Sequence, residues 1–161
     1  MTHQEMFSSA KWLQAQDVIN DKFFVLKGRF TLEKVRKATL RVIGLGFFYC
    51  YINGERVGED YFLPLSTDYE KRENYPVNEI LSGHRIYVPE YDITHMLKDG
   101  ENVIDVHFGG GWYTATVEHS TYGNAKAIWR AFGEDEKGDS AFVSSENDKI
   151  APSYMREYNF P

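Results

Sequence analysis

One stretch, residues 37–60, constrains the fold of this chain more than any other. It reads KATLRVIGLGFFYCYINGERVGED, and its residues alternate with a period of two around a Gly44-Leu45-Gly46 break, with apolar side chains on both faces. This alternation is typical of a strand and places the run in a β-sheet. Asn53 and Gly54 follow, and both tolerate the positive φ angles that a tight type I′ hairpin requires. The sequence therefore predicts that the chain turns back on itself at residues 53–54.

The length and apolar content of the chain fit one domain. With 161 residues, 42% of them hydrophobic, it is large enough to bury about two thirds of the surface of its unfolded chain. Residues 1–10 are polar and small, so we expect a flexible N-terminus whose loss matters little. Residues 11–161 are predicted to form a single β-sandwich domain.

Short segments of alternating hydrophobicity recur along the rest of the chain. Residues 92–98, DITHMLK, predict one helical turn capped by Asp92 or Thr94, and EKREN or VNEIL predicts a second. Many short strands with hardly any helix indicate an all-β fold, an antiparallel β-sandwich of jelly-roll type with one or two short helical turns. The other predicted strands are residues 11–15, 23–32, 85–92 with an edge or bulge at Pro89, 102–108, 126–132, 140–144 and 154–160.

Charge and targeting signals exclude several classes of protein. The net charge is −6 and the basic residues are scattered, so a nucleic-acid partner is not expected. Cys50 is the one cysteine, which excludes an intramolecular disulfide and favours a small buried hydrophobic role. No signal peptide or transmembrane segment is recognised, so we expect a cytoplasmic protein without a membrane partner.

No catalytic motif is evident in the sequence. HExxH, GxSxG, GxxxxGK[ST] and CxxC are absent, and the five histidines lack the spacing of metal ligands. Gly109–Gly111 precedes Trp112-Tyr113 and not a helix, so it is not a dinucleotide-binding fingerprint. Glycoside hydrolysis uses two carboxylates about 5 to 10 Å apart, and nothing in the sequence singles out such a pair. We therefore expect no catalytic residues in this chain.

Two segments supply the ingredients of a carbohydrate site. Sugars present apolar C–H faces and hydroxyl groups, so their sites combine aromatic rings with carboxylates or amides. Trp112 and Tyr113 follow the glycines, and Glu59, Asp60 and Tyr61 follow the hairpin. Solvation of the acidic pair, and packing of Trp112-Tyr113 under a loop or against a neighbouring domain, are the structural alternatives. The long irregular region of residues 61–83 is either a binding rim or a cover for a sheet edge or face.

Four segments together resemble the N-terminal β-sandwich domain of bacterial α-L-rhamnosidases. They are FYCYINGERVGEDYFLP, STDY, HRIYVPEYDITHMLKDGENVIDVHFGGGWY and YGNAKAIWRAF, and the likeness covers roughly residues 11 to 160. The family shows YING..VG.D...P, T.Y, YDVT..LK.GEN, G.GWY and YGD in this order. Asn124 stands here in place of the acid after the Tyr-Gly pair.

The resemblance implies a non-catalytic accessory domain of a glycosidase. Family enzymes carry their catalytic carboxylates on an (α/α)-barrel after this domain, so the parent protein is expected to be an α-L-rhamnosidase. Some related sandwich domains resemble a calcium-dependent rhamnose-binding module, and Glu59 and Asp60 fall where its acidic ligands would lie. A rhamnoside partner at Glu59, Asp60, Tyr61, Trp112 and Tyr113, with calcium at Glu59 and Asp60, is therefore one expectation.

The second expectation is structural. The domain would then pack against the catalytic barrel and stabilise it without binding sugar. The two expectations differ in where the aromatic side chains lie, because a polar cleft suits a sugar and a flat face suits another protein surface. The aromatic residues in question are Trp112, Tyr113, Tyr61, Phe62, Tyr69 and Tyr75.

Overall fold

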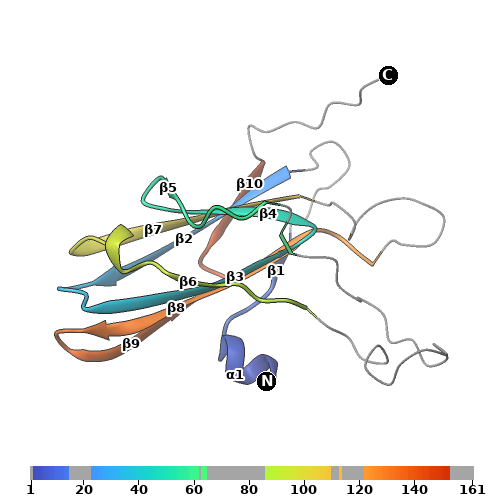
Figure 1. Cartoon of the computed structure of the whole chain (residues 1–161). Helices are drawn as coiled ribbons and strands as arrows, with labels where there is room; N and C mark the ends of the chain where they lie inside the picture. The colour runs from blue at the N-terminus through green and yellow to red at the C-terminus, as the bar shows by residue number, and fades with distance from the viewer. Residues whose placement is uncertain are drawn as a thin grey trace.

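Two antiparallel β-sheets pack face to face in this protein (Figure 1). The computed structural model describes residues 2–14, 23–61, 63–64, 86–109, 113 and 122–152. The described residues include two short helical segments with given bounds, α1 (His3–Phe7) and the 3-10 turn η2 (Thr94–Met96). The predicted all-β sandwich with short helical turns is confirmed, and the jelly-roll subtype stays a prediction.

Five described strands form each sheet. The first sheet has the order β1-β8-β3-β6, with β9 also paired to β8, and the second has the order β10-β2-β7-β4-β5. The first sheet contains β1 (Leu13–Gln14), β3 (Lys37–Leu45), β6 (Glu90–Asp92), β8 (Lys126–Asp135) and β9 (Gly138–Val143). The second contains β2 (Phe23–Leu32), β4 (Phe47–Ile52), β5 (Glu55–Arg56), β7 (Gly100–Gly109) and β10 (Lys149–Pro152).

The stretch of residues 37–60 crosses from one sheet to the other. Strand β3 belongs to the first sheet and β4 to the second, and Gly46, with φ of 120°, joins them. Asn53 (φ 52°) and Gly54 (φ 86°) then connect β4 to β5. The predicted hairpin is confirmed, because both turn residues adopt the positive φ that the tight connection requires.

Most other strand predictions agree with the structure, and the differences lie at the edges. Strand β2 has the predicted bounds, and the expected strand at 85–92 is reduced to β6, an edge strand that begins directly after Pro89. Proline removes a backbone donor, which explains why strand pairing starts after it. The predicted strand at 154–160 lies outside the described residues, and β10 was not predicted.

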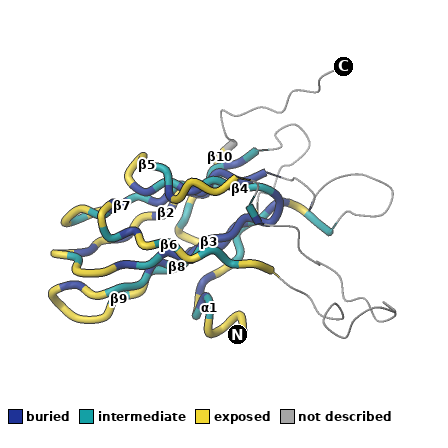
Figure 2. Tube along the Cα trace, viewed as in Figure 1, coloured by how far each residue is buried: buried dark blue, intermediate teal, exposed yellow. Residues whose placement is uncertain are grey.

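Buried positions recur along the paired strands of both sheets (Figure 2), and their apolar side chains form the core. Leu26 and Cys50 lie on either side of Val106, and Val42 lies opposite Trp129 in the first sheet. All five side chains are at most 2% exposed, and each large apolar one contributes about 1.5 to 3 kcal/mol through burial. Burial also raises the pKa of the Cys50 thiol, in agreement with its predicted hydrophobic role.

The outer face of the first sheet is covered by the N-terminal segment. Arg41 and Arg130, directly opposite on β3 and β8, both donate to the backbone carbonyls of Glu5 and Met6 in α1. Phe7 is only 3% exposed and belongs to the core. The burial of Phe7 ties the segment to the core, whereas the flexibility and dispensability of residues 1–10 stay predictions.

A network of two side-chain amides, Asn53 and the buried Asn102, fixes the hairpin to the rest of the second sheet. Asn53 donates to the side-chain oxygen of Asn102 (2.8 Å) and to the carbonyl of Met96 (3.0 Å), and accepts from the amide of Val103 (3.1 Å). Asn102 is fully buried and also bonds the backbone of Lys98 and Gly100. Every polar atom of the Asn102 amide group is thereby paired, which removes the cost of burying it.

Candidate functional site

A group of tyrosine and arginine side chains lies at the exit of the β4–β5 hairpin. The guanidinium carbon of Arg56 sits 4.8 Å from the ring centre of Tyr49 and 4.7 Å from that of Tyr61. Its Nη2 donates to the backbone carbonyl of Asp60 at 2.6 Å. Tyr61 is 64% exposed, and the stacking of the Arg56 guanidinium on its ring holds this projecting side chain in place. We call the four side chains of Tyr49, Arg56, Tyr61 and Tyr91 the Tyr–Arg cluster.

Tyr91 ties the predicted acidic segment to the edge of the first sheet. Its hydroxyl donates to Oδ2 of Asp60 at 3.0 Å, and burial together with this bond raises the pKa of Tyr91. Gly58 lies under the ring, because a Cβ at this position would come within 2.5 Å of Tyr91 Cε1. The hydrogen bond fixes Asp60, whereas Glu59 is exposed at the surface.

The described geometry around Glu59 and Asp60 does not fit a calcium ion well. Calcium takes six to eight oxygen ligands. The carbonyl of Asp60 accepts from the Arg56 guanidinium and its carboxylate accepts from Tyr91. A cation at this position would also be repelled by the guanidinium. In the part of the chain that the structure describes, no group of three His, Cys, Asp or Glu residues is placed to hold a metal ion.

The hollow beside the Tyr–Arg cluster is too small for a sugar. Its volume is about 10 Å³, which is room for one water molecule, and its lining includes Tyr49, Arg56, Asp60 and Tyr91. A ligand at this place would therefore rest on the surface, against Tyr61. The described part of the predicted site is a projecting face and not a cleft.

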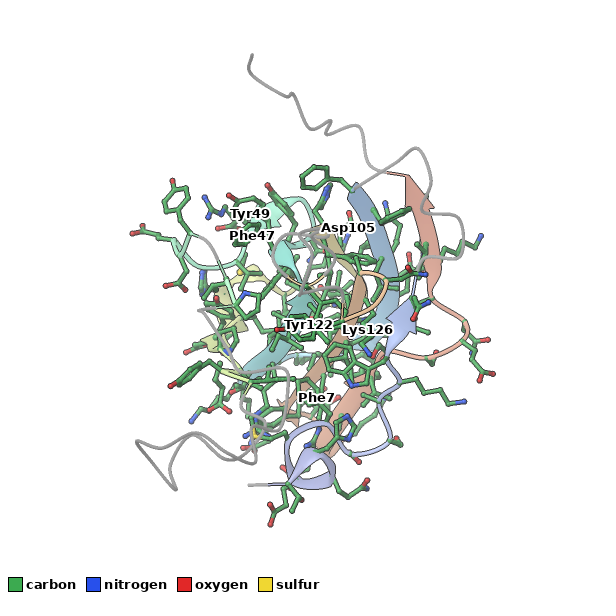
Figure 3. All side chains as sticks on the ribbon, turned by 90° about the vertical axis from the view of Figure 1, so that its right-hand side faces the viewer. Phe7, Phe47, Tyr49, Asp105, Tyr122 and Lys126 are labelled. Carbon is green, nitrogen blue, oxygen red and sulfur yellow. The ribbon has the colours of Figure 1, made fainter. Side chains whose placement is uncertain are left out.

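Tyr113 lies in a different part of the molecule. It is 7% exposed, stacks on Tyr122 with ring centres 5.9 Å apart, and lies 5.6 Å from the ammonium group of Lys126. Figure 3 shows Tyr122 and Lys126 well apart from Tyr49. The structure thus brings Glu59, Asp60 and Tyr61 together but does not bring Tyr113 to them. The remaining predicted site residue, Trp112, and the loop aromatics Phe62, Tyr69 and Tyr75 lie outside the described residues.

A row of polar side chains crosses the outer face of the second sheet. The register aligns Lys27, Asp105 and Tyr51 on neighbouring strands, and Tyr51 lies opposite Arg56 of the cluster. Lys27 Nζ is 3.3 Å from Asp105 Oδ1, close enough for an ion pair although not aligned as a hydrogen bond. His107, two residues further along β7, packs edge-on against Tyr51, and burial lowers its pKa.

A larger groove, which the sequence did not predict, lies at the other end of this row. Its volume is about 520 Å³, within the range of small-molecule sites. The connection between β9 and β10 forms one wall. In this connection the amide of Asp148 donates to the carbonyl of Ser145 (3.0 Å), and Trp129 Nε1 donates to Asp148 Oδ2 (2.9 Å). The full lining is Lys27, Arg29, Phe142, Val143, Ser145, Asn147, Asp148 and Lys149.

The groove depends on pairings that a single sequence does not reveal. Exposed alternate positions on β2 identify Lys27 and Arg29 as surface residues, but only the register of β10 places Lys149 opposite Lys27. Burial raises the pKa of Asp148, against the opposing effect of its bond from Trp129. Polar and apolar groups thus meet in one concave site.

The family of the chain follows from its match to a sequence-family description. Residues 33–149 match the α-L-rhamnosidase N-terminal domain, which is well over half of the chain and includes the hairpin, the Tyr–Arg cluster and most of the groove. The chain belongs to this family. The resemblance stated from the four sequence segments is thereby confirmed.

Curated relatives of this α-L-rhamnosidase N-terminal domain are α-L-rhamnosidases. The Streptomyces avermitilis enzyme is 33% identical over 89 residues, which cover 55% of this chain and 7% of the relative. A Formosa agariphila enzyme is 30% identical over 118 residues, which cover 73% of this chain and 11% of the relative. The chain therefore spans only about a tenth of the length of such relatives.

Solved structures show the same fold. The Streptomyces avermitilis α-L-rhamnosidase, solved in complex with L-rhamnose, matches 83% of this chain and 12% of its own with 26% identity and a TM-score of 0.68. The enzyme from Dictyoglumus thermophilum matches 81% of this chain and 13% of its own, with 29% identity and a TM-score of 0.67. In the described ranges of the present domain, no helix has the length and hydropathy needed to cross a bilayer.

Proposed function

We propose that this chain is a non-catalytic accessory domain of an α-L-rhamnosidase and that its Tyr–Arg cluster docks against a neighbouring domain of the same glycosidase. One observation carries the proposal. Arg56 is held between Tyr49 and Tyr61 at the molecular surface, and Tyr61 projects with 64% of its surface exposed. Tyrosine and arginine are the residues that dominate the binding energy of protein interfaces.

The comparisons support a neighbouring domain as the partner. The segment that matches this chain makes up only 7 to 12% of those α-L-rhamnosidases, so in them it is joined to much further protein. An exposed, preordered surface of tyrosine and arginine suits a protein face better than a small sugar, which needs a concave site. The rhamnoside-hydrolysing activity of such a parent enzyme is part of the proposal.

A chimeric enzyme tests the docking. This chain would replace the matching segment of the Streptomyces avermitilis α-L-rhamnosidase, and the double variant Arg56→Ala/Tyr61→Ala would be compared with the unchanged chimera by scanning calorimetry. We expect the variant to lower the melting temperature of the chimera by several degrees, because an interface anchor is lost. The same variant should leave the isolated domain within about 1 kcal/mol of its original stability, since Tyr61 is mostly exposed.

Matched controls separate docking from other effects. Lys137→Gln removes an exposed charge in the β8–β9 turn of the first sheet and should leave the chimera unchanged. Equal melting temperatures of the double variant and the unchanged chimera would contradict docking at the Tyr–Arg cluster. The isolated domain should also fail to hydrolyse an aryl α-L-rhamnoside, and measurable turnover would contradict its non-catalytic role.

Direct binding of rhamnose is the second candidate function, and the exposed ring of Tyr61 beside Asp60 and Glu59 favours it. Calorimetric titration of the isolated domain with L-rhamnose tests it. If this candidate holds, Tyr61→Ala weakens binding about tenfold or more through the loss of apolar contact. If the cluster serves only for docking, neither the unchanged domain nor its Tyr61→Ala variant gives saturable heat with L-rhamnose.

A further inference from the structure

The geometry points to a second ligand site, independent of the docking surface: the groove between β2, β10 and the β9–β10 connection binds a sugar acid. The ligand would be a uronate, a hexose ring that carries a carboxylate at C6. No residue of this groove belongs to the Tyr–Arg cluster. The inference rests on the charge, the shape and the order of the described residues.

The positive charge of the groove is its first distinguishing feature. Lys27, Arg29 and Lys149 line it together with one carboxylate, Asp148, in a chain whose net charge is −6. Lys149 lies directly opposite Lys27 in the β2–β10 register. Like charges at directly opposed positions destabilise a sheet, and a bound anion would relieve this repulsion.

Of the three cationic side chains that line the groove, two already form ion pairs and Lys149 can bind a ligand. Lys27 faces Asp105, and Arg29 forms an exposed ion pair with Glu101 across β2 and β7. In the described part of the chain, Lys149 has no ion pair. An exposed pair such as Arg29 with Glu101 contributes little, so the arginine can exchange its partner for a ligand carboxylate at low cost. A carboxylate between Arg29 and Lys149 would make charge-assisted hydrogen bonds.

The opposite wall suits the rest of a sugar ring. Phe142 and Val143 are half-buried and present apolar surface, which matches the C–H face of a pyranose. Asn147 and Asp148 lie in the same connection and supply amide and carboxylate groups for hydroxyls. The volume of about 520 Å³ accommodates a sugar of one or a few rings.

The polar wall is ordered before any ligand arrives. The backbone amide of Ser144 donates to the carbonyl of Trp129 at 3.0 Å, and its carbonyl accepts from the amide of Lys11 at 2.9 Å. The Ser144 hydroxyl accepts from the Trp129 amide at 3.2 Å. The indole of Trp129 holds Asp148 at 2.9 Å. A site whose groups are already fixed loses little entropy on binding, which favours even a small ligand.

A matched pair of sugars tests the assignment. The intact chain would be titrated with D-glucuronate and with D-glucose, which differ only at C6, while the amide signals of residues 142–149 are followed by NMR. We expect saturable shifts with glucuronate and none with glucose at the same concentration. Lys149→Gln should weaken glucuronate binding about tenfold, whereas Lys98→Gln, a matched exposed lysine away from the groove, should leave it unchanged.

Four outcomes would overturn the assignment. Equal affinity for glucose and glucuronate would show that the groove does not select a carboxylate. Inorganic phosphate that shifts the same amides with equal affinity would show a general anion site and not a sugar site. Identical dissociation constants for Lys149→Gln and the unchanged protein, or no shifts with any of these probes, would remove the site itself.

Discussion

A single glycine decides how the groove wall is built. Gly28 sits on β2 where a Cβ would lie 2.5 Å from Trp129 Cζ2 and 3.0 Å from Asp148 Oδ2. The missing side chain lets the indole pass over the strand and donate to the carboxylate. The absence of a side chain at Gly28 therefore determines where the Asp148 carboxylate lies in the groove.

The substitution Gly28→Ala tests this close contact. We expect it to destabilise the domain by about 1 to 3 kcal/mol, because the added methyl group overlaps the buried indole ring. Urea unfolding followed by tryptophan fluorescence measures the change. Thr31→Ala, at an exposed position of the same strand, should stay within about 0.5 kcal/mol. An equally small effect of Gly28→Ala would show that Trp129 moves aside without cost.

The raised pKa of Asp148 predicts a dependence of stability on pH. Burial raises the pKa in the folded state, so between the unfolded and folded pKa values the native protein binds more protons than the unfolded chain. Stability from this group therefore falls as the pH rises from about 4 through the folded pKa. Asp148→Asn keeps an acceptor for Trp129 but removes the titration. Relative to this variant, the unchanged protein should lose stability over that pH interval.

Thermal or urea unfolding of both proteins at a series of pH values provides the measurement. Because Asp148 is only half-buried, water screens its charge, and the sign of the trend is the decisive result. A stability difference that stays constant with pH, or moves in the opposite direction, would contradict the effect assigned to burial.

At the scale of elements, the hairpin and the loop before β7 depend on one buried amide. Asn102→Ala would remove every hydrogen bond that the fully buried Asn102 amide group makes to Asn53, Lys98 and Gly100 and would leave a void in its place. We expect a loss of about 3 kcal/mol in urea unfolding. Asn124→Ala, at an exposed position, serves as the control. A loss below about 1 kcal/mol would mean that water replaces the network.

The N-terminal helix α1 stabilises the first sheet through Phe7. Phe7→Ala should cost about 3 kcal/mol, since it empties a buried aromatic site. Gln4→Ala, on the exposed side of the same helix, should change little. Equilibrium unfolding of the two variants compares them directly. Equal stabilities would support the original expectation that the N-terminus is dispensable.

Periodicity alone predicted most of the elements. The buried positions alternate strictly along β2 and along β7 as far as Val106, and the Asn53-Gly54 pair predicted the turn that it forms. The alternation around Gly46 could not reveal that β3 and β4 lie in different sheets, because a strand pattern carries no information about its partners. Likewise α1 was missed, because five residues are too few for a helical period.

The candidate site was only partly predictable for the same reason. The sequence places Glu59, Asp60 and Tyr61 next to one another, but their fixation by Arg56 and Tyr91 depends on a turn and on a strand of the other sheet. Tyr113 looked equally suitable by residue type, yet it packs against Tyr122 and Lys126. The groove joins residues 27–29 to 142–149, a pairing that only the fold provides.

For the whole molecule, the contacts of Asp60 predict how the domain responds to calcium. We expect the same melting temperature in millimolar calcium and in chelator, because Arg56 and Tyr91 already bond the backbone carbonyl and Oδ2 of Asp60. A bound ion would raise the melting temperature in proportion to the logarithm of its concentration. Such a rise, abolished by Asp60→Asn, would instead establish the calcium site suggested by the family resemblance.

We propose that the Tyr–Arg cluster docks onto the rest of a glycosidase, which would shield the hairpin and the residues after it from solvent. Amide hydrogen exchange of residues 47–61 tests it most directly, with the isolated domain compared with the same domain inside the Streptomyces avermitilis chimera. We predict slower exchange at residues 55–61 in the chimera and unchanged exchange in β9, which lies in the other sheet. Equal exchange at residues 55–61 in both proteins would contradict the claim.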